Sequence, residues 1–422
     1  MVAAEAAYED FVWANLRRNY AANYVHGMLG MTGFRLVNAP TFLPAYLGLL
    51  SGSDAIVGLG LALQQLGGVV SPVIGANLVE HRPRVLPAAM VFGTLMRVPI
   101  LLMALSGWFM TGAPLLVSLL VLLFLLGLFS GPQRVVFQLL LAKVIPISRR
   151  GRLQAWRNMT GGIIAAGLAY LAGRYLIQNN VLGNGYATTF MIAFVLTSLG
   201  LTALRLLLRE PVPPTLRPQM TLRDRLKDFP QLMTSDRDFR NFLIAQLLTM
   251  GARLAAPFYI LHAGKTVHLD GATLGLFSVA FLGADTLSNL LWGYVGDRTG
   301  FRVGYLVSLV LWIAATALLM VAHGPGLFVL AFIGLGAAQS GYGMSSQTMV
   351  LEFGLRDDIA IRLAISSMVE GVMAAIGPLA GGLLASQFGY NPVFGLSIGF
   401  LAAALVILWT SVREPRIGVG KA

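Results

Sequence analysis

Long apolar runs without any charge dominate the hydrophobic pattern of this chain. Residues 98–133, 303–351 and 371–412 contain no Asp, Glu, Lys or Arg. Each run is at least 36 residues long, whereas a helix needs only about 20 apolar residues to cross a bilayer. The pattern therefore predicts an all-α polytopic membrane protein. It excludes soluble enzymes, nucleic-acid-binding modules and disulfide-stapled domains.

Charged and Pro/Gly-rich breaks divide the chain into twelve predicted transmembrane helices. A single long polar connection, residues 209–238, separates six helices from six, which predicts an N-terminal bundle at 1–208, a linker at 209–238 and a C-terminal bundle at 239–422. The linker contains TLRDRLKDF, which predicts a short amphipathic helix on the membrane surface. The predicted spans are 22–50, 55–79, 85–107, 113–141, 153–178, 187–208, 240–263, 271–296, 303–323, 326–351, 360–386 and 392–412.

The charges lie almost entirely on one side of these spans. The chain has a mean hydropathy of +0.74, only 11% charged residues and a formal net charge of +12. If the N-terminus is cytoplasmic, only Arg174 and Lys265 fall in the loops and span ends of the opposite side. Because Lys and Arg gather in short cytoplasmic loops, we expect both termini inside. The net charge thus reflects membrane topology, and we expect no nucleic-acid partner.

The two halves of the chain resemble each other at constant offsets. Residues 33–36 recur at 251–254, and Gly75 maps onto Gly293 at the same offset of 218. Ser130-Gly131 maps to Ser340-Gly341 at an offset of 210, which also holds for residues 152–153, 161 and 167. We interpret the halves as two pseudo-symmetric six-helix bundles related by an axis along the membrane normal, with substrate at their interface.

Residues 293–302, GYVGDRTGFR, resemble the cytoplasmic loop motif of the major facilitator superfamily. The equivalent first-half loop, GANLVEHRPR, is degenerate: Val79 stands where the motif has Asp, and Glu80 follows one place late. Span 11 resembles the family's G-x5-G-P-x-x-G-G helix-packing pattern. The resemblance implies the superfamily fold, an alternating-access transporter and a gate at this loop. The implied gating residues are Gly75, Glu80, Arg84, Gly293, Asp297, Arg298, Gly300 and Arg302.

The loop motif also has a direct physical interpretation. Asp297 can accept hydrogen bonds from backbone N–H groups at a neighbouring helix start, or pair with an arginine. Gly300 permits a tight turn. Such a cluster would hold the cytoplasmic helix ends together in one state and release them in another. A plain positively charged loop is the alternative.

Six charged residues are predicted to lie deep in the membrane, where each costs about 2.5–3.5 kcal/mol on the insertion scale. Arg35 and Arg253 occupy matching repeat positions, with Pro40 and Pro257 close behind; these prolines predict bends that unpair backbone carbonyls. With Arg134 on span 4, they predict a positively charged cavity suited to an anionic substrate. Pairing with acids that merely lock helices is the alternative. The six are Arg35, Arg97, Arg134, Arg253, Asp285 and Glu370.

The two deep acids are candidates for proton coupling. A buried carboxylate that alternates between an apolar setting and an arginine partner can bind and release protons. A fixed arginine–carboxylate pair is the alternative for both Asp285 and Glu370. Neutral residues predicted to contact substrate are Asn38, Gln65 and Tyr342, while Arg97 is favoured as structural. Arginines near span ends, Arg157, Arg174, Arg205 and Arg362, are expected to snorkel to the surface.

Four deep arginines face two deep acids, and this surplus favours an anionic or amphipathic substrate. The sequence therefore predicts a secondary transporter of the cytoplasmic membrane, not an enzyme, that moves such a compound with protons by alternating access. We expect a monomer without metal or cofactor, whose partners are small-molecule substrate, protons and membrane lipid. The alternatives are a proton-coupled multidrug efflux pump and a non-transporting member that serves as a scramblase, assembly factor or sensor.

Overall fold

The computed structural model describes residues 2–71, 82–212, 236–353 and 359–414, and this part of the chain is helical throughout its regular structure. Contacts within the chain define two compact units. The first unit contains residues 1–39 and 63–220, and the second contains residues 40–62 and 221–422. The predicted surface helix of the linker, Gly75 and Glu80 lie outside the described residues.

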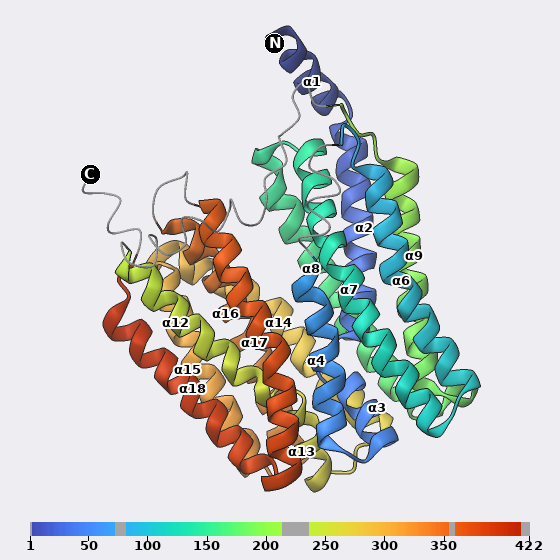
Figure 1. Ribbon diagram of the computed structural model, residues 1–422, viewed down its shortest axis with the longest axis vertical. Helices are drawn as coiled ribbons and strands as arrows, with labels where there is room; N and C mark the ends of the chain where they lie inside the picture. Colours follow the sequence, from blue (N-terminus) through green and yellow to red (C-terminus); the bar gives the residue numbers. More distant parts are fainter. Residues whose placement is uncertain (1, 72–81, 213–235, 354–358, 415–422) are drawn as a thin grey trace. The chain divides into compact units, whose positions relative to one another are not determined.

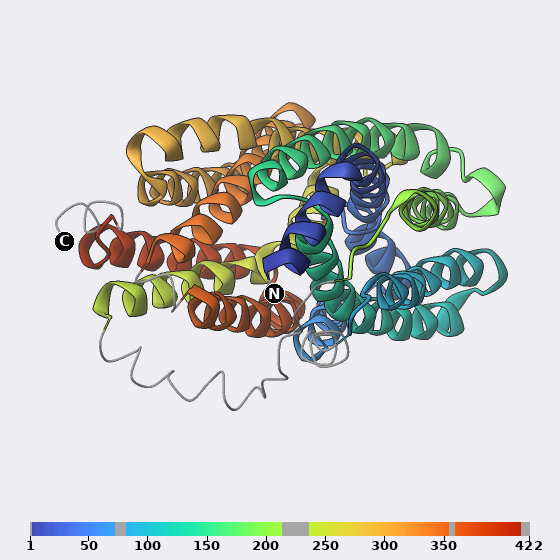
Figure 2. The ribbon, with the colours of Figure 1, turned by 90° about the horizontal axis from the view of Figure 1, so that it is seen from above.

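The first unit is a bundle of long helices. Figure 1 shows α2, α6, α7 and α9 running side by side in it, and Figure 2 views α2 and α9 as adjacent coils close to end-on. α4 enters this unit with its second half, from residue 63 onward. Its helices are α1 (Val2–Ala14), α2 (Leu16–Val37), α4 (Asp54–Val70), α6 (Leu86–Phe109), α7 (Gly112–Val144), α8 (Ile147–Leu171), η1 (Ala172–Ile177), η2 (Val181–Gly183) and α9 (Gly185–Leu207).

The second unit repeats this pattern with a short helix, α3, added from the N-terminal part of the chain. α3 belongs here because Thr41 Oγ1 lies 2.5 Å from Ser278 Oγ and because the helix packs against α13. Its helices are α3 (Phe42–Ser51), the first half of α4, α12 (Arg237–Gly251), η3 (Ala252–Ala255), α13 (Phe258–Thr266), α14 (Gly271–Thr299), α15 (Phe301–Val321), α16 (Pro325–Glu352), α17 (Ile359–Phe388) and α18 (Tyr390–Ser411).

The described part of the chain contains ten helical segments long and apolar enough to cross a membrane. α12, η3 and α13 together count as one of these segments, Arg237–Thr266. The first two predicted spans are not among the ten. The first is broken between Val37 and Phe42, and the second is represented by α4, which is shorter than a full crossing and ends next to residues outside the described range.

The same helix pairs pack together in both units, which supports an internal duplication. In the first unit α2 packs on α9 and α8, and α6 packs on α7 and α9. In the second unit α12 packs on α18 and α17, and α15 packs on α16 and α18. When the units are aligned in chain order, these are equivalent helices. The offsets in the sequence therefore correspond to a repeated packing arrangement.

Close helix packing depends on glycines in both units. A Cβ atom at Gly381 would overlap the carbonyl oxygen of Leu254, and one at Gly127 would overlap that of Gln64. Small residues let helix backbones approach in a membrane, where the hydrophobic effect does not drive helices together. The glycine pattern of span 11 therefore holds α17 against η3, as a helix-packing motif would.

The helix that carries Arg253 is broken at that residue. α12 ends at Gly251, a 3-10 turn covers Ala252–Ala255, and α13 starts after Pro257. The tighter turn and the proline leave a backbone carbonyl exposed to other partners, and Ser397 Oγ donates a hydrogen bond of 2.8 Å to the oxygen of Ala252. The bend expected from Pro257 is thus present, and α18 satisfies the freed carbonyl.

Candidate functional site

A polar cluster lies in the middle of the second unit around the carboxylate of Glu370. Its Oε1 accepts hydrogen bonds from Gln246 Nε2 at 2.9 Å and from Tyr342 OH at 2.9 Å. Ser346 Oγ donates to the same oxygen at 3.3 Å. Gln246 Nε2 also lies 2.8 Å from Ser366 Oγ. We call these five residues the Glu370 cluster; they come from three helices, α12, α16 and α17.

Helical spacing explains why these side chains meet. Tyr342 and Ser346 are four residues apart on α16, and Ser366 and Glu370 are four apart on α17, so each pair shares one face of its helix. Gln246 on α12 is fully buried and reaches both α17 residues. Three polar helix faces therefore converge inside the unit, and the side chains satisfy one another's hydrogen bonds.

Aromatic side chains surround the cluster on one side. The Tyr305 ring lies 5.3 Å from that of Tyr342 in an edge-on arrangement, and the Trp312 ring lies 6.3 Å from it. Tyr305 OH is 3.0 Å from Thr249 Oγ1, so its hydroxyl is also paired. Rigid rings fix the position of the Tyr342 hydroxyl and therefore the direction from which it donates to Glu370.

All hydrogen-bond donors to Glu370 in the described residues are neutral. An amide and two hydroxyls hold the carboxylate, and no ion pair joins it to a Lys or Arg of the described chain. The Glu370 carboxylate therefore differs from those of Asp236 and Glu210, each of which pairs with a cation.

A second buried polar cluster lies in the first unit, and sequence reasoning missed it. Arg157 is 6% exposed, and its guanidinium lies 5.0 Å from the ring centre of Phe137. The His26 ring also packs on Phe137, with the ring centres 4.8 Å apart. We call His26, Phe137 and Arg157 the His26 cluster. Both ring nitrogens of His26 and Nε of Arg157 are buried without a hydrogen-bond partner in the described residues, as are single side-chain atoms of Asn23, Gln133 and Asn158 on the same three helices.

The burial of Arg157 corrects the expectation that it snorkels. α8 starts at Ile147, so Arg157 lies ten residues into the helix rather than one turn from its end. Arg362 is also buried, because its Nη1 pairs with Asp236 Oδ2 at 2.6 Å and its guanidinium covers the Phe239 ring. Both arginines therefore have specific partners inside their units and do not reach outward.

The two clusters occupy equivalent helices of the duplicated units. The His26 cluster lies on α2, α7 and α8, whereas the Glu370 cluster lies on α12, α16 and α17. At the offset of 210, Arg157 corresponds to residue 367, next to Ser366, and Gln133 corresponds to residue 343, next to Tyr342. The duplication has thus kept a polar centre in each unit, basic in the first and acidic in the second.

The predicted arginines have different surroundings. Arg35 is half-buried in the last turn of α2, Arg253 is half-buried in η3, and Arg134 is exposed on α7. Arg97 is 2% exposed and donates from Nε to the Thr197 oxygen at 2.8 Å, so it ties α6 to α9. This supports the structural interpretation of Arg97.

The structure brings two of the remaining predicted site residues into contact. Tyr342 and Glu370, for which different roles were predicted, meet directly. Asn38 is exposed at the end of α2, where its Oδ1 accepts from Gln64 Nε2 at 2.6 Å, and Gln65 is exposed on α4. Asp285 is half-buried on α14 and is not among the hydrogen-bond partners of Glu370.

At the loop motif, Gly300 has a φ of +87° and ends α14, as its predicted turn requires. Asp297 is exposed and makes no hydrogen bond within the described residues; the carboxylate at the start of α15 is instead Glu414, which accepts from the Arg302 backbone N–H at 3.2 Å. The Arg302 side chain donates to the last carbonyls of α18, on Leu408 and Trp409.

The other described motif residues lie elsewhere around this loop and its first-half equivalent. Gly293 is half-buried on α14, Arg298 is stacked on Tyr294, and Arg84 is exposed before α6.

The first unit has an equivalent carboxylate. Glu210 accepts from the backbone N–H groups of Val85 at 2.6 Å and Leu86 at 2.8 Å, at the start of α6, and pairs with Lys143 at 3.2 Å. Arg209-Glu210-Pro211 follows the last helix of the first unit, and Arg413-Glu414-Pro415 follows the last helix of the second. This repeated tripeptide is the sequence signal that could have identified both caps.

We expect Glu210→Gln to destabilise the first unit. The Glu210 side chain is only 3% exposed, so its neutralisation leaves two helix-start N–H groups and Lys143 with a weaker acceptor. The expected loss is roughly 1–3 kcal/mol of unfolding free energy. Thermal unfolding of the purified protein in detergent measures it, with the exposed Glu9→Gln on α1 as matched control. Equal unfolding midpoints for the two variants would refute this role for Glu210.

The amino-acid sequence is similar to that of known protein families and relatives. The family model described as Major Facilitator Superfamily matches residues 27–245 and 241–422. Among curated proteins, the multidrug resistance protein MdtG of Yersinia enterocolitica is 29% identical over 163 residues, 37% of this chain and 38% of that protein. An uncharacterized protein of Mycobacterium tuberculosis is 24% identical over 302 residues, 69% of this chain and 57% of that protein. The chain thus matches less than two thirds of the length of these relatives.

Solved structures share the fold at low sequence identity. The D-xylose-proton symporter superposes with a TM-score of 0.74 at 13% identity, covering 95% of this chain and 99% of that one. The nucleoside transporter NupG gives a TM-score of 0.69 at 15% identity, covering 96% of this chain and 99% of that one. The family match covers nearly the whole chain, and the helical segments are long enough to span a bilayer. This chain is therefore a multi-pass membrane protein, and it belongs to the major facilitator superfamily.

Proposed function

We propose that this protein is a proton-coupled secondary transporter of small organic anions or amphipathic compounds, acting in the cytoplasmic membrane by alternating access. The observation that carries the coupling step is the Glu370 cluster, in which neutral donors alone hold a half-buried carboxylate within the described residues. A charge in the membrane interior costs free energy, and the cost is reduced when the charge pairs with an opposite charge or faces a water-filled cavity. Proton binding to Glu370 would remove that cost during part of the transport cycle.

The proposed topology has twelve crossings and two cytoplasmic termini. The two crossings beyond the ten apolar segments would be the predicted spans at 22–50, which contains most of α2 and nearly all of α3, and at 55–79, to which α4 belongs. The six-plus-six division, with the linker at 209–238, remains part of this proposal. The distribution of Lys and Arg supports the orientation.

The anionic substrate class rests on guanidinium groups inside the units. Arg253 lies half-buried where its helix is broken, and Arg157 lies buried beside His26. A guanidinium in a low-dielectric setting binds carboxylate and phosphate groups strongly and with defined geometry. The roles of Arg35, Arg134, Asn38, Gln65 and Tyr342 at a substrate site belong to the same proposal.

A panel of ligands tests the substrate class. We expect benzoate, citrate or sn-glycerol 3-phosphate to raise the thermal unfolding midpoint of the purified protein, because a ligand that binds only the folded state stabilises it. Arg253→Gln should lose most of this shift, whereas the matched control Arg174→Gln, at an exposed position of η1, should keep it. Stabilisation by none of the anions, or an unchanged shift in Arg253→Gln, would contradict an anion site at Arg253.

Efflux of lipophilic drugs is the second candidate function, and the similarity to MdtG favours it. In that case the cationic dye ethidium, rather than the anions, would stabilise the protein. Expression in a drug-sensitive bacterial strain would also raise resistance to ethidium. The Glu370 cluster would serve proton coupling in either case, so the ligand panel separates the two functions.

A further inference from the structure

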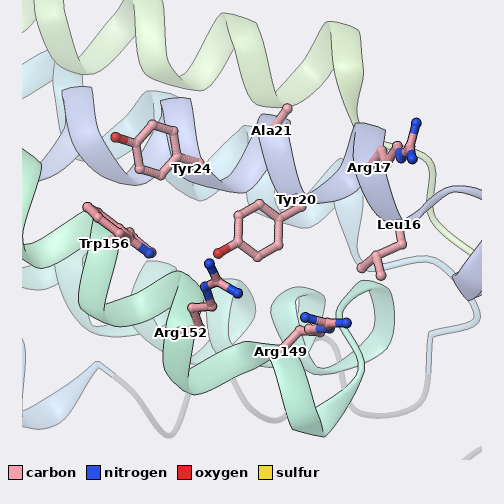
Figure 3. Close-up of a pocket in the computed structure, with 8 residues that line it drawn as sticks. All are labelled: Leu16, Arg17, Tyr20, Ala21, Tyr24, Arg149, Arg152 and Trp156. Carbon is pink, nitrogen blue, oxygen red and sulfur yellow. The ribbon is translucent and has the colours of Figure 1, made fainter.

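A pocket of about 570 Å³ opens within the first unit between α2 and α8. It lies toward the start of α2, and its lining contains none of the residues of the His26 cluster. Figure 3 draws the eight lining residues. Figure 3 shows Tyr20 between the two helices, with its hydroxyl directed toward the Arg152 guanidinium. The pocket is lined by Leu16, Arg17, Tyr20, Ala21, Tyr24, Arg149, Arg152 and Trp156.

Three arginines give this pocket a positive charge that nothing in the described chain neutralises. Arg17, Arg149 and Arg152 are exposed, and none of their guanidinium groups forms a hydrogen bond or ion pair with a described residue. Their sequence neighbours behave differently. Arg18 donates to the Leu207 oxygen, and Arg150 donates to the Ile145 oxygen, so both of these side chains tie helices together. The pocket arginines are therefore the ones available to a ligand.

The rest of the lining is aromatic and apolar. Leu16, Tyr20 and Tyr24 repeat every four residues along one face of α2, opposite Trp156 on α8. Trp156 is 47% exposed although it is one of the largest apolar side chains. From Arg17 to Tyr24 the lining extends about 10 Å along the axis of α2, at 1.5 Å per residue. The pocket thus offers charge at one end and apolar surface further along.

We propose that this pocket binds an anionic phospholipid. Its phosphate would lie between the guanidiniums of Arg17, Arg149 and Arg152, and an acyl chain would lie along the tyrosines and Trp156. Basic pockets between transmembrane helices bind acidic headgroups on the cytoplasmic side, and Tyr and Trp favour the membrane–water boundary. Under the proposed orientation this end of the unit lies in the cytoplasmic leaflet. The inference requires the membrane location but no particular transport substrate.

The shape of the lining favours a lipid over a free anion. A soluble phosphate would use only the arginines and would leave the aromatic surface without a role. A phospholipid covers both parts at once, and the bilayer supplies it at high local concentration. The proposal therefore commits to a lipid with a phosphate-based anionic headgroup.

Native mass spectrometry of the full chain, titrated with phosphatidylglycerol and with phosphatidylcholine, tests the proposal. We expect phosphatidylglycerol to bind more tightly than phosphatidylcholine. The double variant Arg149→Gln/Arg152→Gln should bind phosphatidylglycerol roughly tenfold or more weakly, because each arginine near the surface contributes to the attraction of acidic lipid. Arg205→Gln/Arg209→Gln, which removes the same charge from exposed positions outside the pocket, should bind like the unmodified chain.

Two further arms identify the occupant and check folding. Trp156→Ala keeps all three arginines and should still weaken phosphatidylglycerol binding, since it removes the apolar contact. Inorganic phosphate should not displace the bound phosphatidylglycerol. If phosphate does displace it, the pocket is a site for soluble anions and the proposal is overturned. Equal losses in the pocket and control double variants, or no preference for phosphatidylglycerol, would also overturn it. The thermal unfolding midpoint of each variant is also measured without added lipid. An unchanged midpoint shows that the weaker lipid binding is not caused by misfolding.

Discussion

Glu370→Gln is expected to abolish concentrative transport while leaving substrate exchange intact. Glutamine has nearly the same size and keeps an oxygen that Gln246, Tyr342 and Ser346 can donate to, so the cluster stays assembled. It cannot gain or lose a proton, however. The pH gradient would then no longer drive accumulation, whereas movement of substrate down its own gradient would continue.

The measurement uses proteoliposomes and the anion that gives the largest thermal shift. Accumulation above the external concentration, driven by an imposed pH gradient, should be lost in Glu370→Gln, and only entry to equilibrium should remain. Counterflow of the same compound between loaded vesicles and medium should persist. Tyr342→Phe, which removes one donor and keeps the carboxylate, should lower driven uptake only in part.

Asp285→Asn separates the two candidate acids. Asp285 lies on α14, outside the Glu370 cluster, so we expect its neutralisation to leave pH-driven uptake measurable. If Asp285→Asn abolishes driven uptake and Glu370→Gln does not, the coupling role belongs to the other carboxylate and the assignment here is wrong.

Gly381→Ala is expected to cause the largest loss of stability in the second unit. The added Cβ would overlap the carbonyl oxygen of Leu254, which belongs to the backbone of η3 and cannot rotate away. α17 would have to move from η3, and overpacking of this kind costs roughly 1–3 kcal/mol. Because α17 also carries Ser366 and Glu370, the shift should weaken transport as well as folding.

Thermal unfolding in detergent measures this effect, with Gly395→Ala as the matched control. Gly395 lies on α18, and nothing lies within 4 Å of the position where its Cβ would be. An alanine there should leave the midpoint unchanged or raise it, since it removes backbone entropy from the unfolded chain. If Gly381→Ala unfolds at the same temperature as Gly395→Ala, α17 and η3 do not need their close contact.

The fold class was predictable from the sequence because a helix that crosses a bilayer requires an apolar run of about 20 residues. Helix breaks were predictable where proline dictates them, as at Pro257. The actual start of α8 was not, because Ser148–Arg152 is polar yet continues the helix. That difference of two turns is the reason Arg157 was expected at the surface when it is buried.

The candidate site was predictable residue by residue but not as a cluster. Glu370 and Tyr342 are conspicuous because polar groups are rare in these spans, yet their contact depends on how α16 and α17 pack. Gln246, which lies 124 residues before Glu370 in the chain, joins them from another helix. Glu210 escaped notice because a carboxylate beside prolines resembles a loop residue, although its buried position caps α6.

If Glu370 couples the two fluxes, protons must cross the membrane together with the substrate. Proteoliposomes loaded with the pH-sensitive dye pyranine, with no pH gradient imposed, report proton flux when the identified anion is added outside. We expect a change of internal pH with the unmodified protein and none with Glu370→Gln, although both move the compound. Substrate flux without any pH change in the unmodified protein, or the same pH change in Glu370→Gln, would contradict it.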